Sequence, residues 1–241
     1  MKKPQILNLL LLIIVVIFIS FFIFNNFKKD TSLAPSSFVK TPHFLDSTPM
    51  HDEIYVAQPV NITINFDFDL ATGSEIFVVD DQGQQAATGD IKIEDSNTAL
   101  KKDLTGQLSD GKYKVMYKAC WPDGSCHDGS FEFSIDSKKI SEYLDMRGRG
   151  EVTVKMTGLK YEPEKIIISP ETKIVWENLE DIGHFVNTET HPEHTYFPSQ
   201  NSRELKLGDI FETVFEKPGQ YNYHCSAHVP EGMLGAIVVA N

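Results

Sequence analysis

Three side chains that bind soft metal ions lie close together near the C-terminus, at Cys225, His228 and Met233. Thiolate and thioether sulfur suit Cu(I), and imidazole suits both oxidation states of copper. Together they form a ligand set for a copper ion that changes its oxidation state. A blue-copper site of this kind needs a second histidine from elsewhere in the chain, and His184 is the candidate. The alternative is a buried structural cysteine with an unrelated histidine and methionine nearby, because cysteine is commonly buried.

The composition is that of a folded, acidic protein. Of the 241 residues, 41% are hydrophobic and 23% are charged, which is ordinary for a globular chain. The length allows one or two domains. The formal net charge of -12 argues against nucleic acid as a partner, because nucleic acid selects basic surfaces.

An apolar run near the N-terminus has the length of a membrane-spanning helix. Residues 6–24 include only two polar side chains, and a helix needs about 20 apolar residues to cross a bilayer. Secretory signals have a shorter apolar core and a small-residue cleavage site, and this chain lacks such a site. We therefore interpret residues 1–30 as an uncleaved signal anchor and residues 31–42 as a tether rich in Ser, Thr and Pro. The remainder is expected to be periplasmic or extracellular.

Alternation of apolar and polar residues predicts β-strands on both sides of a polar segment at 137–150. The expected strands are residues 60–68, 75–79, 112–118, 131–135, 151–156, 165–169, 173–177, 205–207, 211–215, 220–223 and 236–239. No helical period accompanies them. The prediction is an all-β protein with two β-sandwich domains, at 43–136 and 151–241, joined by a linker over 137–150.

The first predicted domain contains several short motifs. They are Ser47-Thr48-Pro49, Ile62-x-Ile64-x-Phe66, Gly111-x-Tyr113-x-Val115, Asp123 and Gly129-Ser130-x-x-Phe133. With these motifs the domain resembles the periplasmic copper-resistance protein C family. The resemblance implies an Ig-like sandwich and, in members that bind Cu(II), an N-terminal histidine with an Asp and a His of a late loop. Asp123 matches that Asp, the next ligand position is Ser125, and His127 lies two residues later, so Asp123 and His127 are candidates for a second metal site.

Cys120 and Cys126 flank a turn in the same domain. The chain has three cysteines, and assigning Cys225 to a metal leaves these two as a pair. The sequence Pro122-Asp123-Gly124 is a turn signal that brings them together. A disulfide is the simpler interpretation, and it fits an oxidising compartment. A Cu(I) site that also uses His127, or a pair of free or redox-active thiols, is the alternative.

The second predicted domain carries four motifs in order. They are Tyr161-x-Pro163, Val175-Trp176-x-Asn178, Pro218-Gly219-x-Tyr221-x-Tyr223-x-Cys225-x-x-His228 and Gly232-Met233-x-Gly235. In this respect the domain resembles the cupredoxins, most closely plastocyanin and pseudoazurin. The resemblance implies a Greek-key sandwich with one type 1 (blue) copper ion, a trigonal ligand set of His184, Cys225 and His228, and Met233 as the weak axial ligand.

Three positions in this domain add to or depart from the family pattern. Phe185 stands where the family often has an Asn that ties the two ligand loops together. His224 stands where an aromatic residue often precedes the cysteine, and it is either a polar exit route for electrons or a surface histidine. His191 and His194, in a loop over 188–198, have a spacing that allows a second metal site, although exposed loop histidines are also common.

These observations favour a membrane-anchored, extracytoplasmic protein that carries single electrons and is not an enzyme, because all four copper positions are filled by side chains. Its expected partner is a redox protein such as a cytochrome, an oxidase or another membrane electron-transfer complex. The alternative is a copper-binding or delivery protein in copper homeostasis or resistance, with a copper donor or acceptor protein as its partner. A copper enzyme is a third hypothesis, for which His224-Cys225 supplies half of the His-Cys-His arrangement that such enzymes need.

Overall fold

The structure is a computed structural model that describes residues 38–95, 97–104 and 106–241. The predicted signal anchor and most of the predicted tether lie outside these residues. Within the described part of the chain, no helix is long and apolar enough to cross a membrane. The described elements all belong to one compact unit, Ser37–Asn241.

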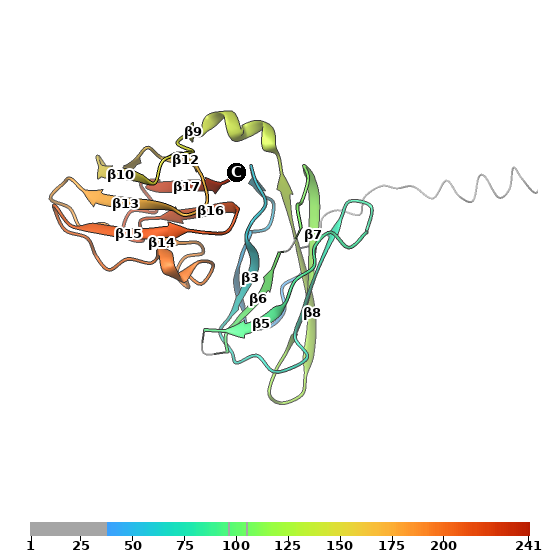
Figure 1. Ribbon diagram of the computed structural model, residues 1–241. Coiled ribbons are helices and arrows are strands. Elements are labelled where there is room, and N and C mark those ends of the chain that lie inside the picture. Colours follow the sequence, from blue (N-terminus) through green and yellow to red (C-terminus); the bar gives the residue numbers. More distant parts are fainter. Residues whose placement is uncertain (1–37, 96, 105) are drawn as a thin grey trace, which may run out of the picture. The chain divides into compact units, whose positions relative to one another are not determined.

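The first half of this unit is a sandwich of two four-stranded sheets (Figure 1). One sheet has the order β1 (Phe44–Thr48), β3 (Asn61–Phe66), β6 (Ala99–Asp103) and β5 (Ile91–Glu94). The other has the order β2 (Glu53–Tyr55), β8 (Cys126–Ile135), β7 (Gly111–Cys120) and β4 (Glu75–Asp80). Alternation explains the core: along β7, Tyr113, Val115 and Tyr117 are buried while Lys112 and Met116 are exposed.

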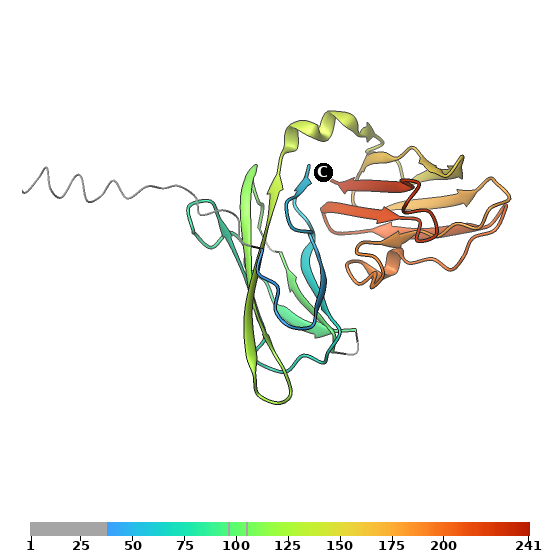
Figure 2. The same ribbon diagram turned by 180° about the vertical axis from the view of Figure 1, so that it is seen from behind.

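The second half is a sandwich of a four-stranded and a five-stranded sheet, seen from both sides in Figures 1 and 2. The first has the order β11 (Lys160–Glu162), β10 (Glu151–Thr157), β13 (Thr172–Asn178) and β15 (Ile210–Phe215). The second has the order β14 (Asn187–Thr188), β16 (Gly219–His224), β17 (Leu234–Val239), β12 (Lys165–Ile168) and β9 (Leu144–Asp145). The predicted all-β architecture of two sandwiches is thus confirmed.

One sequence prediction about local structure was wrong, and one predicted connection contains short elements. The predicted strand 205–207 is absent: Leu205 forms only an isolated bridge to His184, and Leu207 is exposed. The predicted linker is structured. It forms a 3-10 helix, η1 (Ser137–Glu142), and then β9, which pairs in parallel with β12. Alternation identified neither β9 nor the single bridge at Leu205, since a strand of two residues or a single bridge is too short to set up an alternating pattern.

Within Ser37–Asn241 the two sandwiches share hydrogen bonds around Tyr196. The Tyr196 hydroxyl accepts the backbone N–H of Val60 (2.8 Å) and donates to the carbonyl of Gln220 (2.8 Å). The side-chain oxygen of Gln220 in turn accepts the backbone N–H of Val56 (2.7 Å). Val60 is also buried in the core of the second sandwich. A second 3-10 helix, η2 (Pro198–Gln200), follows this tyrosine.

Candidate metal centre

The loop between β16 and β17 holds three of the predicted copper ligands. Pairing of Tyr223 with Gly235 and of His224 with Leu234 fixes both ends of the loop. Inside it, the N–H of Cys225 donates to the carbonyl of Met233 (3.0 Å). The N–H of Met233 donates to the carbonyl of His228 (3.1 Å), and that of His228 to the carbonyl of Cys225 (2.9 Å). The three side chains are therefore anchored to one another through the backbone.

Glycines are required at two points of this loop for different reasons. Gly232 has a φ of 78°, in the left-handed region that other residues rarely adopt, and so allows the turn before Met233. Gly235 is a packing position: a Cβ there would lie 2.2 Å from the ring of Tyr223. Of the two glycines of the motif, only Gly232 therefore has a positive φ.

His184 reaches the site from the segment between β13 and β14. Its N–H donates to the carbonyl of Leu205 (3.0 Å), and the Leu205 N–H donates back to its carbonyl (2.7 Å). The Asn178 side chain donates to the carbonyls of Ile182 (2.7 Å) and Leu205 (2.9 Å). These bonds hold the histidine from both sides, and His184 is fully buried.

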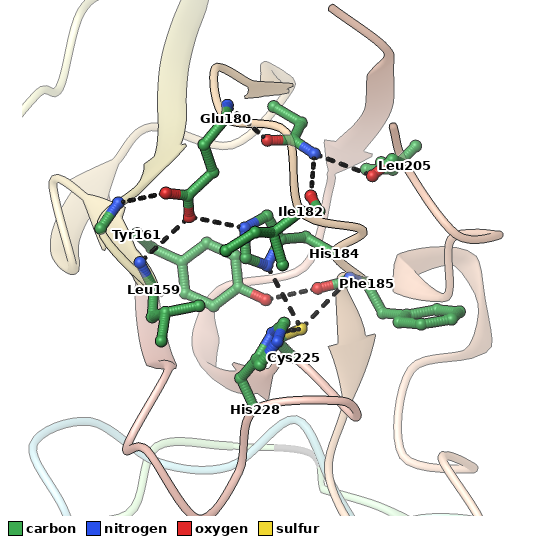
Figure 3. A network of polar contacts seen from close by, with 11 residues as sticks. Leu159, Tyr161, Glu180, Ile182, His184, Phe185, Leu205, Cys225 and His228 are labelled. Carbon is green, nitrogen blue, oxygen red and sulfur yellow. Dashed lines mark hydrogen bonds and ion pairs between the residues drawn. The ribbon is translucent and has the colours of Figure 1, made fainter. Parts of the chain in front are cut away.

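The side chains converge on the Cys225 sulfur, as Figure 3 shows. Cys225 Sγ lies 3.3 Å from His228 Nδ1 and 3.7 Å from His184 Nδ1, and all three atoms lie within 4.8 Å of one another. Metal–thiolate and metal–imidazole bonds of about 2.3 and 2.0 Å in a trigonal arrangement place sulfur and nitrogen about 3.7 Å apart. Met233 is fully buried in the same core cluster as Cys225. The residues present therefore fit a type 1 copper ion.

Glu180 orients His184. Its Oε1 lies 2.7 Å from His184 Nε2 and accepts the N–H of Leu159 (3.0 Å), while Oε2 accepts the N–H of Gly158 (2.9 Å). Burial alone raises the pKa of Glu180, but these N–H groups and His184 outweigh it, and the pKa is lowered overall. The carboxylate thus keeps the proton of His184 on Nε2 and leaves Nδ1 free to bind a metal. Sequence reasoning missed Glu180, because its contacts depend on the path of a loop.

Two further contacts link the ligand segments. The backbone N–H of Phe185 donates to Cys225 Sγ (3.3 Å). The Ser226 hydroxyl donates to the side-chain oxygen of Asn187 (2.9 Å). A side-chain tie between the loops is therefore present although Phe185 replaces the usual Asn, because Asn187 supplies it two residues later.

Comparison with known families agrees with this geometry. Residues 149–240 match the family described as copper binding proteins, plastocyanin/azurin family, and residues 44–136 match the CopC domain. The chain carries a CopC domain and a plastocyanin/azurin-family domain. The cofactor is accordingly copper.

Individual relatives resemble one domain each. The halocyanin of Natronomonas pharaonis is 31% identical over 102 residues, which are 41% of this chain and 61% of the halocyanin, so this chain spans about three fifths of its relative's length. The solved structure of CopC from Methylosinus trichosporium OB3b is 24% identical over 40% of this chain and 94% of its own, with a TM-score of 0.35. A Cu(I) structure of an amicyanin variant is 22% identical over 38% of this chain and 83% of its own, with a TM-score of 0.33.

In the CopC domain, Cys120 and Cys126 form a disulfide across the hairpin of β7 and β8. The predicted disulfide is confirmed, and the alternatives of a Cu(I) site using these cysteines or of free thiols are wrong. Asp123 accepts the N–H (2.8 Å) and hydroxyl (2.7 Å) of Ser125 in its own turn. Asp123 and His127 belong to neither of the groups of three metal-binding side chains found among the described residues.

In the plastocyanin/azurin-family domain, the structure brings His191 and His194 together with His224. His191 Nδ1 lies 3.4 Å from His194 Nε2, which lies 3.1 Å from His224 Nε2. His224 is buried, so it is not a surface histidine. Sequence reasoning singled out all three residues but did not group His224 with the other two.

Proposed function

We propose that the protein carries single electrons through one type 1 copper ion bound by His184, Cys225, His228 and Met233. The convergence of two imidazole nitrogens on the buried Cys225 sulfur is the observation that carries this proposal. When bound, copper supplies a reversible couple between Cu(I) and Cu(II) at such a ligand set.

The protein's part is to hold the ligands in one arrangement for both oxidation states. Cys225, His184 and Met233 are fully buried, so water has little access to the sulfur atoms. The backbone bonds within the β16–β17 loop, the Glu180 carboxylate and the tie between Asn187 and Ser226 restrain both ligand segments. A rigid, buried site with four protein ligands supports electron transfer better than catalysis, which requires a position open to substrate.

The least buried ligand marks the face through which electrons would pass. His228 is only partly buried, and the exposed apolar residues Val229 and Leu234 lie in and beside its loop. Exposed apolar side chains in and beside the loop of a partly exposed imidazole suit brief contact with a redox partner, since weak electron-transfer complexes use small interfaces. The partner we propose is a cytochrome, an oxidase or another membrane electron-transfer complex.

We also propose that the protein is extracytoplasmic and that residues 1–30 anchor it in the membrane. Two observations support it: the apolar run in the sequence and the disulfide between Cys120 and Cys126. Disulfides persist in oxidising compartments and are rare in the cytosol. Protease accessibility in spheroplasts, from which any outer membrane and cell wall have been removed, tests this location: digestion of the CopC domain from outside supports it, and protection that is lost only when the spheroplasts are lysed contradicts it.

Copper delivery is the second candidate function, and the presence of a CopC domain favours it. The two functions differ in what happens to the metal. A carrier exchanges electrons reversibly in voltammetry and keeps its copper when mixed with an apo acceptor protein. A delivery protein loses copper to that acceptor at a rate above spontaneous release, and such a loss would overturn the carrier assignment.

A further inference from the structure

We propose that His191, His194 and His224 bind a second metal ion, a divalent transition-metal ion with Cu(II) preferred, next to the type 1 site. Two of the histidines come from the loop between β14 and η2, and the third is the last residue of β16. Each histidine offers one ring nitrogen, and these three nitrogens all lie within 4.8 Å of one another. The proposal does not depend on copper at Cys225.

The separations match those that one metal ion imposes. Metal–imidazole bonds of about 2.0–2.1 Å in a tetrahedral arrangement place two nitrogens about 3.3 Å apart. The observed distances from His194 Nε2 are 3.4 Å to His191 Nδ1 and 3.1 Å to His224 Nε2. Only small side-chain movements are therefore needed to bind an ion.

Hydrogen bonding alone does not account for the arrangement. The single nitrogen His194 Nε2 faces three polar atoms: the two histidine nitrogens and Ser226 Oγ at 3.2 Å. An imidazole nitrogen carries either one hydrogen or one lone pair in the plane of the ring, so it forms one good hydrogen bond. A shared metal ion would instead satisfy the three nitrogens together.

The scaffold fixes two of the three side chains. His224 is paired with Leu234 and Asn187 in the sheet and is buried. The N–H of His194 donates to the carbonyl of Thr190 (2.7 Å), and its carbonyl accepts from the Asn201 side chain (2.8 Å). His191 is exposed and leaves a path for an ion to enter. The site is thus largely preformed and open on one side.

The donor set selects the class of metal. Three imidazoles without a thiolate suit Cu(II), Zn(II) and Ni(II), and Cu(II) forms the most stable complexes among the divalent ions of this series. Three protein ligands leave a fourth position for water or a small ligand. This separates the site from the type 1 centre, whose thiolate and thioether also accept Cu(I).

The two proposed sites are neighbours in the chain, because His224 directly precedes Cys225. One ligand of each site is therefore joined to the other through a single peptide bond. Occupancy of the histidine site is expected to change the electronic environment of the cysteine, which provides a spectroscopic readout besides the metal count.

The test is a metal count and an electron paramagnetic resonance spectrum of the full chain loaded with Cu(II). The wild-type protein should bind two copper ions, one of them with the spectrum of a site with nitrogen ligands and no thiolate. His194→Ala should remove only that second signal. It should lower the affinity for the second ion at least about 100-fold, because the loss of a residue that merely contacts a metal ligand already lowers metal affinity by up to about 100-fold. His127→Ala is the control, and it should still bind two ions.

The Cys225→Ser variant separates this proposal from the proposed function. It should retain one Cu(II) or Zn(II), and a further His194→Ala change should abolish that binding. One copper ion in the wild-type protein, or two in the His194→Ala variant, overturns the histidine site. Loss of the blue band alone, with the histidine signal intact, contradicts only the type 1 assignment.

Discussion

Removal of the Glu180 carboxylate should destabilise the metal-free protein by about 1–4 kcal/mol. Glu180→Ala leaves the Nε2–H group of His184 without its partner at 2.7 Å, and that imidazole is fully buried. An unpaired buried donor costs about 1–3 kcal/mol. The N–H groups of Gly158 and Leu159 also lose an acceptor, but both residues are at least partly exposed, so water replaces it at a cost of about 1 kcal/mol or less in total.

Glu180→Gln separates the charge from the hydrogen bonds. The amide oxygen still accepts from His184, so the expected loss is about 1 kcal/mol, in line with the difference between charged and neutral acceptors. Urea unfolding of the metal-free protein at neutral pH measures both variants. Glu162→Ala, which removes an exposed carboxylate from β11, is the control and should change the unfolding free energy by less than about 0.5 kcal/mol.

The same variants should weaken copper binding by about 10- to 100-fold, because an outer carboxylate fixes the orientation and basicity of a histidine ligand. Competition with a copper chelator measures this change. Glu180→Ala with the stability and copper affinity of the control would refute the role assigned to the carboxylate. Equal losses in the Ala and Gln variants would show that the charge alone matters and that the hydrogen bond to His184 contributes nothing.

Three further predictions concern other parts of the chain. Burial, reinforced by the nearby Glu53, raises the pKa of Glu189 to about 8 from 4.5, so folded protein keeps a proton that the unfolded chain loses. The unfolding free energy should therefore decrease between about pH 4.5 and 8, by a few kcal/mol at most, because one pKa unit is about 1.4 kcal/mol. Denaturation curves at pH 5 and 8 should show a smaller decrease in the Glu189→Gln variant than in the wild-type protein. An equal decrease in the two proteins would contradict the raised pKa. Asn187→Ala removes the acceptor of the loop tie and should lower copper affinity by about 10-fold in chelator competition; wild-type affinity would show that the tie is dispensable. Replacing Cys120 and Cys126 by Ser opens a short loop and should cost about 2 kcal/mol in urea unfolding while the blue colour stays; loss of the colour would contradict the separation of the two sites.

The sequence was sufficient for the type of fold because period-two alternation is strong in the long strands. In β7 and β13 nearly every second side chain enters a core, and both strands were predicted within a few residues. Short pairings carry no such signal. Leu144 and Asp145 were predicted to lie in a linker, and they form an edge strand. Leu205 was predicted to lie in a strand, and it forms only one bridge.

The candidate site likewise contains residues that the sequence could predict and residues that it could not. Cys225, His228 and Met233 were predictable together because one short loop holds them, and family motifs added His184. Glu180 and Asn187 were not, since their contacts depend on where a loop folds back. The grouping of His224 with His191 and His194 follows from the pairing of β14 with β16, which places His224 opposite Asn187. Pattern and spacing identify ligands within a segment, whereas contacts between segments require the fold.

The visible spectrum of the copper-loaded full chain, with and without the Cys225 thiol, tests the central claim most directly. The account predicts an intense blue band in the oxidised wild-type protein that disappears on reduction and returns on reoxidation. Cys225→Ser should abolish the band, and Met233→Ala should keep it with a shifted reduction potential, because the thioether is the weak axial ligand. An oxidised, copper-loaded wild-type protein without the band, or a Cys225→Ser variant that retains it, would contradict a type 1 copper site.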